Sequence, residues 1–348
     1  MTNRESVPLG DRKSLAIPPA IGHQPSAICL LDIFRARKRI APYIRRTPLV
    51  PSQWLSAVAG GRVSLKLESL QRSNSFKIRG AFNAVIARLE RPGHGPRRLV
   101  TASAGNHGRA LAAAAETFRL PLIVYTPIDA PHAKLGAIRA HGAELRAVGR
   151  DYDDAERLAK AFAAESGAEF ISPYSDADVI AGAATVAVEI FEDAAGTDTL
   201  IVPIGGGGLI GGVASAAKSI NTRCDIVGVE VDASCPFQTS LRSGRLVEIV
   251  PGATLADGLA GNPDPETITW PIIQRLVDRI VTVSETDLAA AIVGLVEAEH
   301  VITEGAGAVG VAATLARRVD LSGRHAVIVV TGANIDRARL AALFSQGV

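Results

Sequence analysis

The chain of 348 residues holds 37 Lys and Arg against 35 Asp and Glu, which leaves a formal net charge of +2. This balance excludes a strongly basic protein that binds nucleic acid or a membrane surface mainly through charge. Apolar residues make up 47% and aromatic residues only 4%, so we expect a globular protein with an aliphatic core. The length indicates about two domains, and no apolar run reaches the roughly 18 residues of a membrane helix.

The N-terminal region and the cysteines indicate the compartment. Residues 1–26 are polar and rich in proline, so we expect a flexible tail without a signal-peptide pattern. Cys29, Cys224 and Cys235 are too few and too scattered for a disulfide framework or a zinc site. We therefore expect a soluble cytoplasmic protein.

From residue 27 onward, short β-branched runs alternate with alanine-rich stretches of helical length. The predicted strands are 63–67, 99–102, 120–125, 144–148, 169–172, 200–204, 226–231, 280–283 and 326–330. The predicted helices are 78–89, 108–117, 133–141, 154–165, 179–193, 209–219, 285–297 and 308–318. This alternation predicts an α/β protein with mainly parallel sheets. Nine strands are more than a single sheet usually contains, which favours two lobes with a cleft between them.

The first motif is Ser-Asn-Ser-Phe-Lys-Ile-Arg-Gly at residues 73–80. A lone lysine is usually a solvated charge, but Lys77 follows a strand and a turn and opens an apolar helix beside Phe76. The positive end of the helix dipole favours the neutral amine there. A neutral amine is the form that Schiff-base chemistry requires.

The second motif is Thr-Ala-Ser-Ala-Gly-Asn-His-Gly at residues 101–108, between a predicted strand and a predicted helix. Small residues at this place expose backbone N–H groups at the helix N-terminus, which suits a carboxylate or a phosphate. The alternative is a tight turn with Asn106 as the helix cap. The motif alone does not decide between the two.

The third motif places four consecutive glycines, Gly205 to Gly208, between a buried strand and a helix. Backbone of this kind allows the close approach of a phosphate group. The motif is not a P-loop, because no Lys-Ser or Lys-Thr pair follows, and it lacks the G-x-G-x-x-G pattern of dinucleotide sites. A single phosphate monoester is the ligand that fits best.

The fourth motif is Thr-Gly-Ala-Asn at residues 331–334, after the last predicted strand. Ligands of open α/β sheets bind outside the carboxyl ends of the strands, and Thr331 places a neutral hydroxyl there. The alternative is a simple strand end, with Asn334 capping the next helix.

Together these motifs resemble the fold-type-II pyridoxal-phosphate enzymes, in their threonine/serine dehydratase and serine racemase branch. The resemblance extends from Arg-Arg-Thr-Pro-Leu at residues 45–49 to residues 331–334 and includes the stretches 66–68, 134–139 and 304–308. It implies two open, twisted, mainly parallel sheets flanked by helices, as in the β subunit of tryptophan synthase, with the cofactor between the lobes. We expect residues 27–97 and 174–348 to form the large cofactor-binding domain and residues 98–173 the small domain.

The resemblance implies pyridoxal 5'-phosphate as the cofactor and assigns roles to the motif residues. Lys77 matches the catalytic Schiff-base lysine, and Phe76 matches the residue that packs near the ring. The other matches are Asn106 for the ring 3-hydroxyl, Gly205, Gly206, Gly207, Gly208 and Leu209 for the phosphate, Thr331 for the pyridine nitrogen, and the backbone of Ser103, Ala104, Gly105, Asn106 and His107 for the substrate carboxylate.

The implied reaction is elimination of water from a β-hydroxy amino acid to give a 2-keto acid and ammonia. Lys77 removes the α-proton, and the cofactor phosphate protonates the leaving hydroxyl. Candidate substrates are threonine or serine, 3-hydroxyaspartate, and a hydroxyectoine-derived compound, since Gly-Ala-Ala-Thr at residues 182–185 departs from the usual Gly-Gln-Gly-Thr of relatives. Partners are expected to be a small-molecule substrate and a second copy of the chain, with no nucleic acid or membrane.

Two alternatives stay open, an amino-acid racemase and a non-catalytic ligand sensor that keeps the cofactor. Similar racemases carry a second serine where this chain has Ala104, and a methyl group cannot deliver a proton. The intact Lys77 and glycine motif speak against the sensor.

Three further residues are uncertain at this stage. Relatives that bind a divalent cation use a glutamate matching Glu230 and a second acid where this chain has Pro236, so Glu230 is interpreted as a structural carboxylate and no metal is assigned. Arg109 and Arg157 are interpreted as solvated surface charges. If Arg157 entered the site instead, a substrate with a second carboxylate would become plausible.

Overall fold

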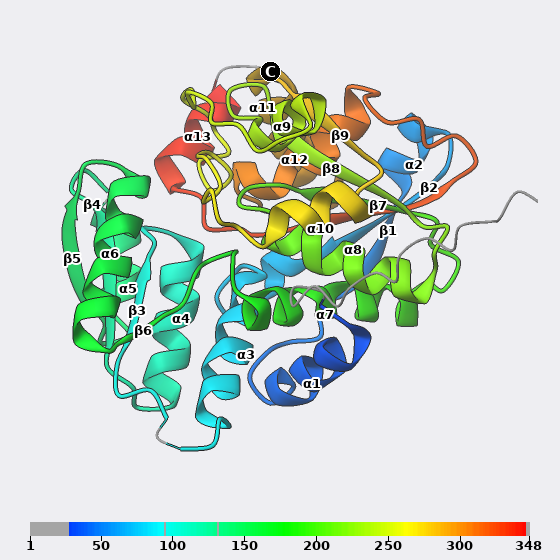
Figure 1. The fold of residues 1–348 in the computed structure, drawn as a ribbon. Helices are drawn as coiled ribbons and strands as arrows, with labels where there is room; N and C mark the ends of the chain where they lie inside the picture. Colours follow the sequence, from blue (N-terminus) through cyan, green and yellow to red (C-terminus); the bar gives the residue numbers. More distant parts are fainter. Residues whose placement is uncertain (1–27, 94, 131, 346–348) are drawn as a thin grey trace, which may run out of the picture.

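The computed structural model describes residues 28–93, 95–130 and 132–345, which form two sheets with helices around them (Figure 1). The predicted flexible tail lies outside the described residues. The larger sheet has six strands in the order β1-β2-β10-β7-β8-β9, and only β1 is antiparallel to its neighbour. Its strands are β1 (Leu49–Ser52), β2 (Arg62–Leu67), β7 (Thr199–Pro203), β8 (Asp225–Val231), β9 (Arg279–Val283) and β10 (His325–Val330).

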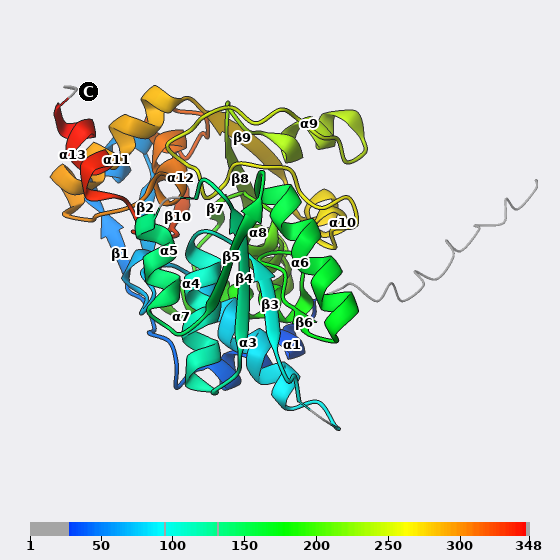
Figure 2. The same ribbon diagram turned by 90° about the vertical axis from the view of Figure 1, so that its left-hand side faces the viewer.

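The smaller sheet has four parallel strands in the order β5-β4-β3-β6, seen face-on in Figure 2. Its strands are β3 (Leu99–Ala102), β4 (Leu122–Pro127), β5 (Glu144–Gly149) and β6 (Glu169–Phe170). All four lie between residues 98 and 173, and we propose these residues as the small domain and the flanking parts, 27–97 and 174–348, as the large one.

Helices cover both sheets, as expected for parallel strands joined by crossovers. They are α1 (Leu30–Ile40), α2 (Gln53–Ala59), α3 (Lys77–Leu89), α4 (Asn106–Thr117), α5 (His132–Arg139), α6 (Tyr152–Ser166), α7 (Ala177–Asp193), α8 (Gly208–Ile220), α9 (Pro236–Ser243), α10 (Thr269–Leu276), α11 (Glu285–Glu299), α12 (Gly305–Leu315) and α13 (Arg337–Ser345), with a 3-10 turn at Glu68–Leu70. None of the described helices is both long and apolar enough to cross a bilayer.

The alternating side chains of the central strands explain the layers. Leu200 and Val329 pack with α7 and α8 on one face of the large sheet. Ile201 and Ile328 pack with α11 and α12 on the other face. Strands covered on both sides must be apolar along their whole length, which is why β7 and β10 read as continuous apolar runs.

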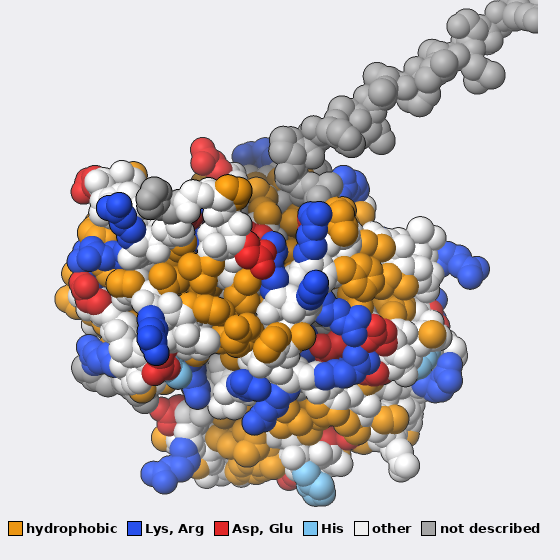
Figure 3. Space-filling view, turned by 90° about the horizontal axis from the view of Figure 1, so that it is seen from below, with side chains coloured by type: hydrophobic (Ala, Val, Ile, Leu, Met, Phe, Trp, Pro, Cys, Tyr) orange, Lys and Arg blue, Asp and Glu red, His pale blue; other side chains and the backbone are white. Residues whose placement is uncertain are grey.

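The surface agrees with the balanced composition. Seen from below, Lys and Arg are interspersed with Asp and Glu, and hydrophobic side chains gather near the middle of the face (Figure 3). Acidic side chains lie among the basic ones in this view.

The α/β class with two mainly parallel sheets is confirmed. All nine predicted strands are present, β3 with the predicted ends and the others with shifted ends, and β1 is a tenth that the pattern did not predict. The pattern also missed five helices, namely α1, α2, α9, α10 and α13.

Candidate active site

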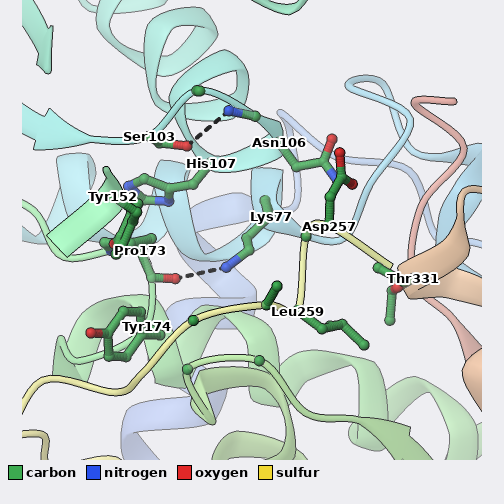
Figure 4. A pocket seen from close by; sticks show the side chains of 18 of the residues that line it. Lys77, Ser103, Asn106, His107, Tyr152, Pro173, Tyr174, Asp257, Leu259 and Thr331 are labelled. Carbon is green, nitrogen blue, oxygen red and sulfur yellow. Dashed lines mark hydrogen bonds between the residues drawn. The ribbon is translucent and has the colours of Figure 1, made fainter. Parts of the chain in front are cut away.

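A cavity of about 430 Å³ lies where loops from the two sheets meet, and it brings together every predicted site residue (Figure 4). Its walls include Phe76, Lys77, Ser103, Ala104, Gly105, Asn106, His107, Gly205, Gly206, Gly207, Gly208, Leu209 and Thr331. The four motifs are far apart in the sequence, so their convergence is a property of the fold. The loops follow β3, β7 and β10 at the carboxyl ends of the strands, where open α/β sheets bind ligands.

Lys77 is the first residue of α3, and its half-buried side chain lines the cavity. The Nζ atom donates a hydrogen bond of 2.9 Å to the carbonyl oxygen of Pro173 and lies 5.2 Å from the centre of the Phe76 ring (Figure 4). Burial lowers the pKa of Lys77 to about 8, although the nearby Glu304 carboxylate opposes this effect. The amine is therefore much closer to neutrality than a solvated lysine at physiological pH.

The loop that precedes α4 is organised by Ser103. Its Oγ atom accepts hydrogen bonds from the backbone N–H groups of Gly105, at 3.2 Å, and Gly108, at 3.0 Å. Gly105 is the N-cap residue and α4 begins at Asn106, so the alternative in which the Asn106 side chain caps this helix is wrong. The N–H groups at the start of α4 have no partner within the helix and can bind an anion.

The Asn106 side chain belongs to a hydrogen-bond network instead of a cap. Its Nδ2 atom donates to Glu304 at 2.6 Å, and its Oδ1 atom accepts from Nδ2 of Asn334 at 2.6 Å. Asn334 also accepts a hydrogen bond of 2.7 Å from Arg109. The interpretation of Arg109 as a solvated charge is therefore wrong, because it donates to Asn334. The interpretation of Asn334 as a helix cap is also wrong, because its side chain donates to Asn106 and to the Ser73 carbonyl.

Glu304 is a site residue that the motif analysis left without a role. Burial raises its pKa to about 7, and the hydrogen bond from Asn106 acts in the opposite direction. Its position next to Gly332 is tight, since a Cβ at that glycine would lie 2.2 Å from the Glu304 carboxylate. Glu304 is the first residue of one of the stretches that resemble the family, so the sequence did single it out. The neighbouring residues, however, gave no indication that Glu304 contacts Asn106.

The four glycines form a cradle that larger residues would fill. A Cβ at Gly206 would lie 2.2 Å from the Tyr174 ring, and Gly207 has φ of 85°, in the left-handed region. The hydroxyl of Thr269 holds the loop by donating to the Gly206 carbonyl at 2.9 Å. Because α8 begins at Gly208, free N–H groups of its first turn face the loop. A phosphate monoester fits this backbone.

Thr331 and His107 complete the walls of the cavity. Thr331 is 3% exposed, and its carbonyl accepts a hydrogen bond of 3.0 Å from the Phe76 N–H group, which ties the fourth motif to the first. Burial, with a smaller effect from Lys77, lowers the pKa of His107 to about 3, so its ring is neutral. The cavity thus offers the Lys77 amine with its lowered pKa, the neutral hydroxyl of Thr331 and an anion-binding loop at each of two helix starts, which fits pyridoxal phosphate and an amino acid.

None of the three uncertain residues, Arg109, Arg157 and Glu230, lines this cavity. Arg157 is 67% exposed and pairs with Asp154, as its interpretation as a solvated charge predicts. Glu230 accepts hydrogen bonds from the N–H groups of Phe237 and Gln238 at the start of α9, so its two oxygens are used by the helix. The part of the chain that the structure describes holds no cluster of three or more metal-ligating side chains.

Comparison with known proteins agrees with this geometry. The family model described as pyridoxal-phosphate dependent enzyme matches residues 40–332. The chain is 39% identical to an L-threonine ammonia-lyase of Thermotoga maritima over 323 residues, covering 92% of this chain and 79% of the other. It is 38% identical to an L-threo-3-hydroxyaspartate ammonia-lyase of Saccharomyces cerevisiae over 314 residues, covering 90% and 95%. The structure of maize serine racemase superposes with a TM-score of 0.85 at 33% identity, covering 92% and 98%.

Proposed function

The chain belongs to the family of pyridoxal-phosphate dependent enzymes, and we propose that it is an ammonia-lyase that eliminates water from a β-hydroxy amino acid. The products are a 2-keto acid and ammonia. The observation that carries this proposal is the position of the Lys77 amine, whose pKa is lowered, in one cavity with the glycine cradle and the Ser103 loop. The similarity to proteins named as ammonia-lyases supports the same reaction.

The cavity residues would hold the cofactor at three points. The N–H groups of residues 205–209 would hold the phosphate, the Thr331 hydroxyl would serve the pyridine nitrogen, and Asn106 would serve the ring hydroxyl. When bound, pyridoxal phosphate supplies the electron sink that allows the α-proton of an amino acid to leave. Thr331 has a neutral hydroxyl rather than a carboxylate, so it does not favour a charged pyridinium. The cofactor ring would therefore withdraw electrons only moderately.

Lys77 does the acid–base work of this chain. With a pKa lowered to about 8, its amine is neutral often enough at physiological pH to accept the α-proton of the substrate. The carbonyl of Pro173 fixes the direction of the amine through the 2.9 Å hydrogen bond. The free N–H groups at the start of α4 hold the substrate carboxylate and so orient the α-carbon toward Lys77.

Ala104 favours elimination over racemisation. Racemisation requires a second acid or base on the other face of the substrate, and Ala104 supplies neither. The similarity to serine racemase keeps inversion as the second candidate, to be measured alongside keto-acid release.

The test is release of keto acid from a panel of β-hydroxy amino acids by the cofactor-loaded protein, with threonine and serine first. We expect turnover by the wild type and a loss of several orders of magnitude in Lys77→Ala. Lys218→Ala is the matched control, since Lys218 pairs with Asp278 outside the cavity and its loss should leave turnover unchanged. A loaded protein that releases no keto acid from any member of the panel would refute the proposal.

We further propose that the protein acts in the cytoplasm as a homodimer or a higher homo-oligomer. Exposed apolar side chains on and near α1, including Leu31 and Phe34, support contact with a second copy, and the underside of the molecule carries hydrophobic groups near its middle (Figure 3). Analytical ultracentrifugation tests this state. A concentration-independent monomer mass would contradict it.

A further inference from the structure

Two residues after Lys77, helix α3 contributes to a buried cluster of charged side chains that the proposed mechanism does not use. The cluster consists of Arg79 on α3, Lys66 on β2, Glu68 and Glu189 on α7, and each of these four residues is at most 5% exposed. Two cations face two carboxylates, so their charges balance. We call this group the Arg79 cluster.

The guanidinium of Arg79 uses all five of its N–H donors. Nε and Nη2 each donate to Glu68 at 2.8 Å, while Nη1 and Nη2 donate to Glu189 at 2.7 and 2.8 Å. Nη1 also donates to the hydroxyl of Thr185 at 3.1 Å. A planar fork that is held by a carboxylate on each of two sides has a fixed orientation as well as a fixed position.

Three stretches of the sequence that have no role in the cavity meet at this cluster, namely residues 45–49, 66–68 and 182–185. The first stretch supplies Thr47, whose hydroxyl donates to Glu68 at 2.5 Å and whose carbonyl accepts from Lys66 at 2.7 Å. The second supplies Lys66 and Glu68 themselves, and the third supplies the Thr185 hydroxyl. These distant stretches therefore converge on one side chain of α3.

The Arg79 cluster is joined to Lys77 through the first turn of α3. The backbone N–H group of Arg79 donates to the Phe76 carbonyl at 3.0 Å and so closes the turn that contains Lys77. Helix α7 approaches this turn so closely that a Cβ at Gly182 would lie 2.5 Å from the Arg79 carbonyl oxygen. The backbone and the side chain of Arg79 are thus both fixed, while Lys77 lines the cavity and donates to Pro173 (Figure 4).

We propose that Arg79 is a positioning residue for the reaction, because the Arg79 cluster fixes the first turn of α3 and thereby the place of the Lys77 amine. Stability alone does not explain the cluster, since a buried ion pair is often no more stabilising than apolar side chains of similar volume. This inference rests on the proposed function, because Lys77 is the group that removes the α-proton there.

The variant Arg79→Lys tests the inference, because it keeps the charge and loses the planar fork. The matched control is Arg88→Lys in the last turn of the same helix, since Arg88 is also buried and pairs with Asp176 and Glu169. Both variants should unfold at a lower temperature than the wild type. Only Arg79→Lys should displace Lys77, so the comparison separates an effect on position from an effect on stability.

The first measurement is the attachment of pyridoxal phosphate to the cofactor-free chain as a function of pH, fixed with borohydride and assigned to Lys77 by mass spectrometry. The wild type should show a midpoint near pH 8, because burial lowers the pKa of Lys77 to about 8. A displaced amine is better hydrated, so the midpoint of Arg79→Lys should rise by about half a pH unit or more, and that of Arg88→Lys should not move. Glu304 and His107, which also titrate near this amine, are the same in all three proteins.

The second measurement is the turnover of the cofactor-loaded proteins. Arg79→Lys should lower kcat by about tenfold to a hundredfold with little change in KM, since a displacement of about 1 Å can cost a factor of 10². Arg88→Lys should lower kcat by less than about threefold, because the last turn of α3 does not hold the amine.

Two results would overturn the inference. One is an unchanged pH midpoint and kcat in Arg79→Lys, and the other is an equal change in Arg79→Lys and Arg88→Lys, which would follow stability rather than position. If Arg79→Lys does not fold, Thr185→Val takes its place, because it removes one acceptor of Arg79 at nearly constant volume. That variant should lower kcat by about threefold, and wild-type kcat in it would equally overturn the inference.

A failure of the proposed function gives a different result. A wild-type protein that attaches the cofactor at Lys77 but releases no keto acid from any β-hydroxy amino acid would refute the proposed function alone. The pH midpoints of Arg79→Lys and Arg88→Lys would then still decide whether Arg79 positions Lys77, because attachment requires no turnover.

Discussion

The glycine cradle allows a sharp prediction, because two glycines near the same helix should respond to alanine in opposite ways. At Gly206 the new Cβ would lie 2.2 Å from the Tyr174 ring, far inside the 3.5 to 4.0 Å or so of normal carbon contacts. The ring cannot simply swing away, because its hydroxyl is held by Asp264 and Glu156. At Gly211, within α8, the nearest atom to a new Cβ is 3.5 Å away in Ile272, so alanine fits.

The expected effects follow from these contacts. Overpacking costs about 1 to 3 kcal/mol, so Gly206→Ala should unfold at a lower temperature and bind pyridoxal phosphate about tenfold or more weakly, since about 1.4 kcal/mol corresponds to a factor of ten. Gly211→Ala should be neutral or gain up to about 1 kcal/mol, because alanine is the better helix former.

The assay compares pyridoxal phosphate with pyridoxal, which lacks the phosphate. If residues 205–209 bind the phosphate, Gly206→Ala weakens the first ligand much more than the second, while Gly211→Ala affects neither. Equal weakening of both ligands would place the damage elsewhere, and an unchanged affinity and unfolding midpoint in Gly206→Ala would refute the cradle geometry.

The buried charges and Ala104 lead to three further predictions. The Lys77 amine has a pKa of about 8 in the folded protein against 10.5 for an ordinary lysine. Between these two pH values the unfolded apoprotein binds more protons than the folded one, so the stability of the wild-type apoprotein rises with pH. Lys77→Met apoprotein should therefore be more stable in urea than the wild-type apoprotein near pH 7, by up to about 3 kcal/mol, and this difference should shrink toward pH 10. Arg79→Met should cost about 3 to 5 kcal/mol of unfolding free energy, because Glu68 and Glu189 would stay buried without their cation, whereas Arg37→Met, which removes a surface pair with Glu192, should cost less than about 1 kcal/mol. Ala104→Ser should raise racemisation relative to elimination, measured by chiral analysis of the substrate beside keto-acid release.

β1 and α9, two of the elements that the sequence pattern missed, are both short. β1 has only four residues, is an edge strand and contains Pro51, and proline within a short run argues against a strand. α9 is a short helix, but its signals were readable, since Pro236 occupies the first position and Gly244 ends it in the left-handed conformation. Both are short elements in which end signals, rather than periodicity, carry the information.

Site residues could be predicted where a single segment of the sequence indicates their function, as for Lys77 at the start of an apolar helix and for the four consecutive glycines. It was not predictable where a side chain depends on a distant partner. Asn106 has the local features of a helix cap, and only the fold places Glu304 and Asn334 beside it.

Ala104 offers the most direct test of the reaction outcome, since a single position should shift the balance between two reactions. The residue lines the cavity within the loop that Ser103 organises, and similar racemases carry a serine there. Elimination uses one base, Lys77, and one acid, which the cofactor phosphate can supply, whereas inversion needs a second acid or base on the opposite face. A well-placed group of that kind is worth about 10² to 10⁴ in rate, or roughly 3 to 5 kcal/mol of barrier. Wild-type protein incubated with one enantiomer in deuterated water should therefore release keto acid far faster than it forms the deuterated opposite enantiomer, and Ala104→Ser should narrow that gap. Rapid inversion by the wild type, outpacing keto acid, would show that another residue serves the opposite face and that elimination is not the main reaction.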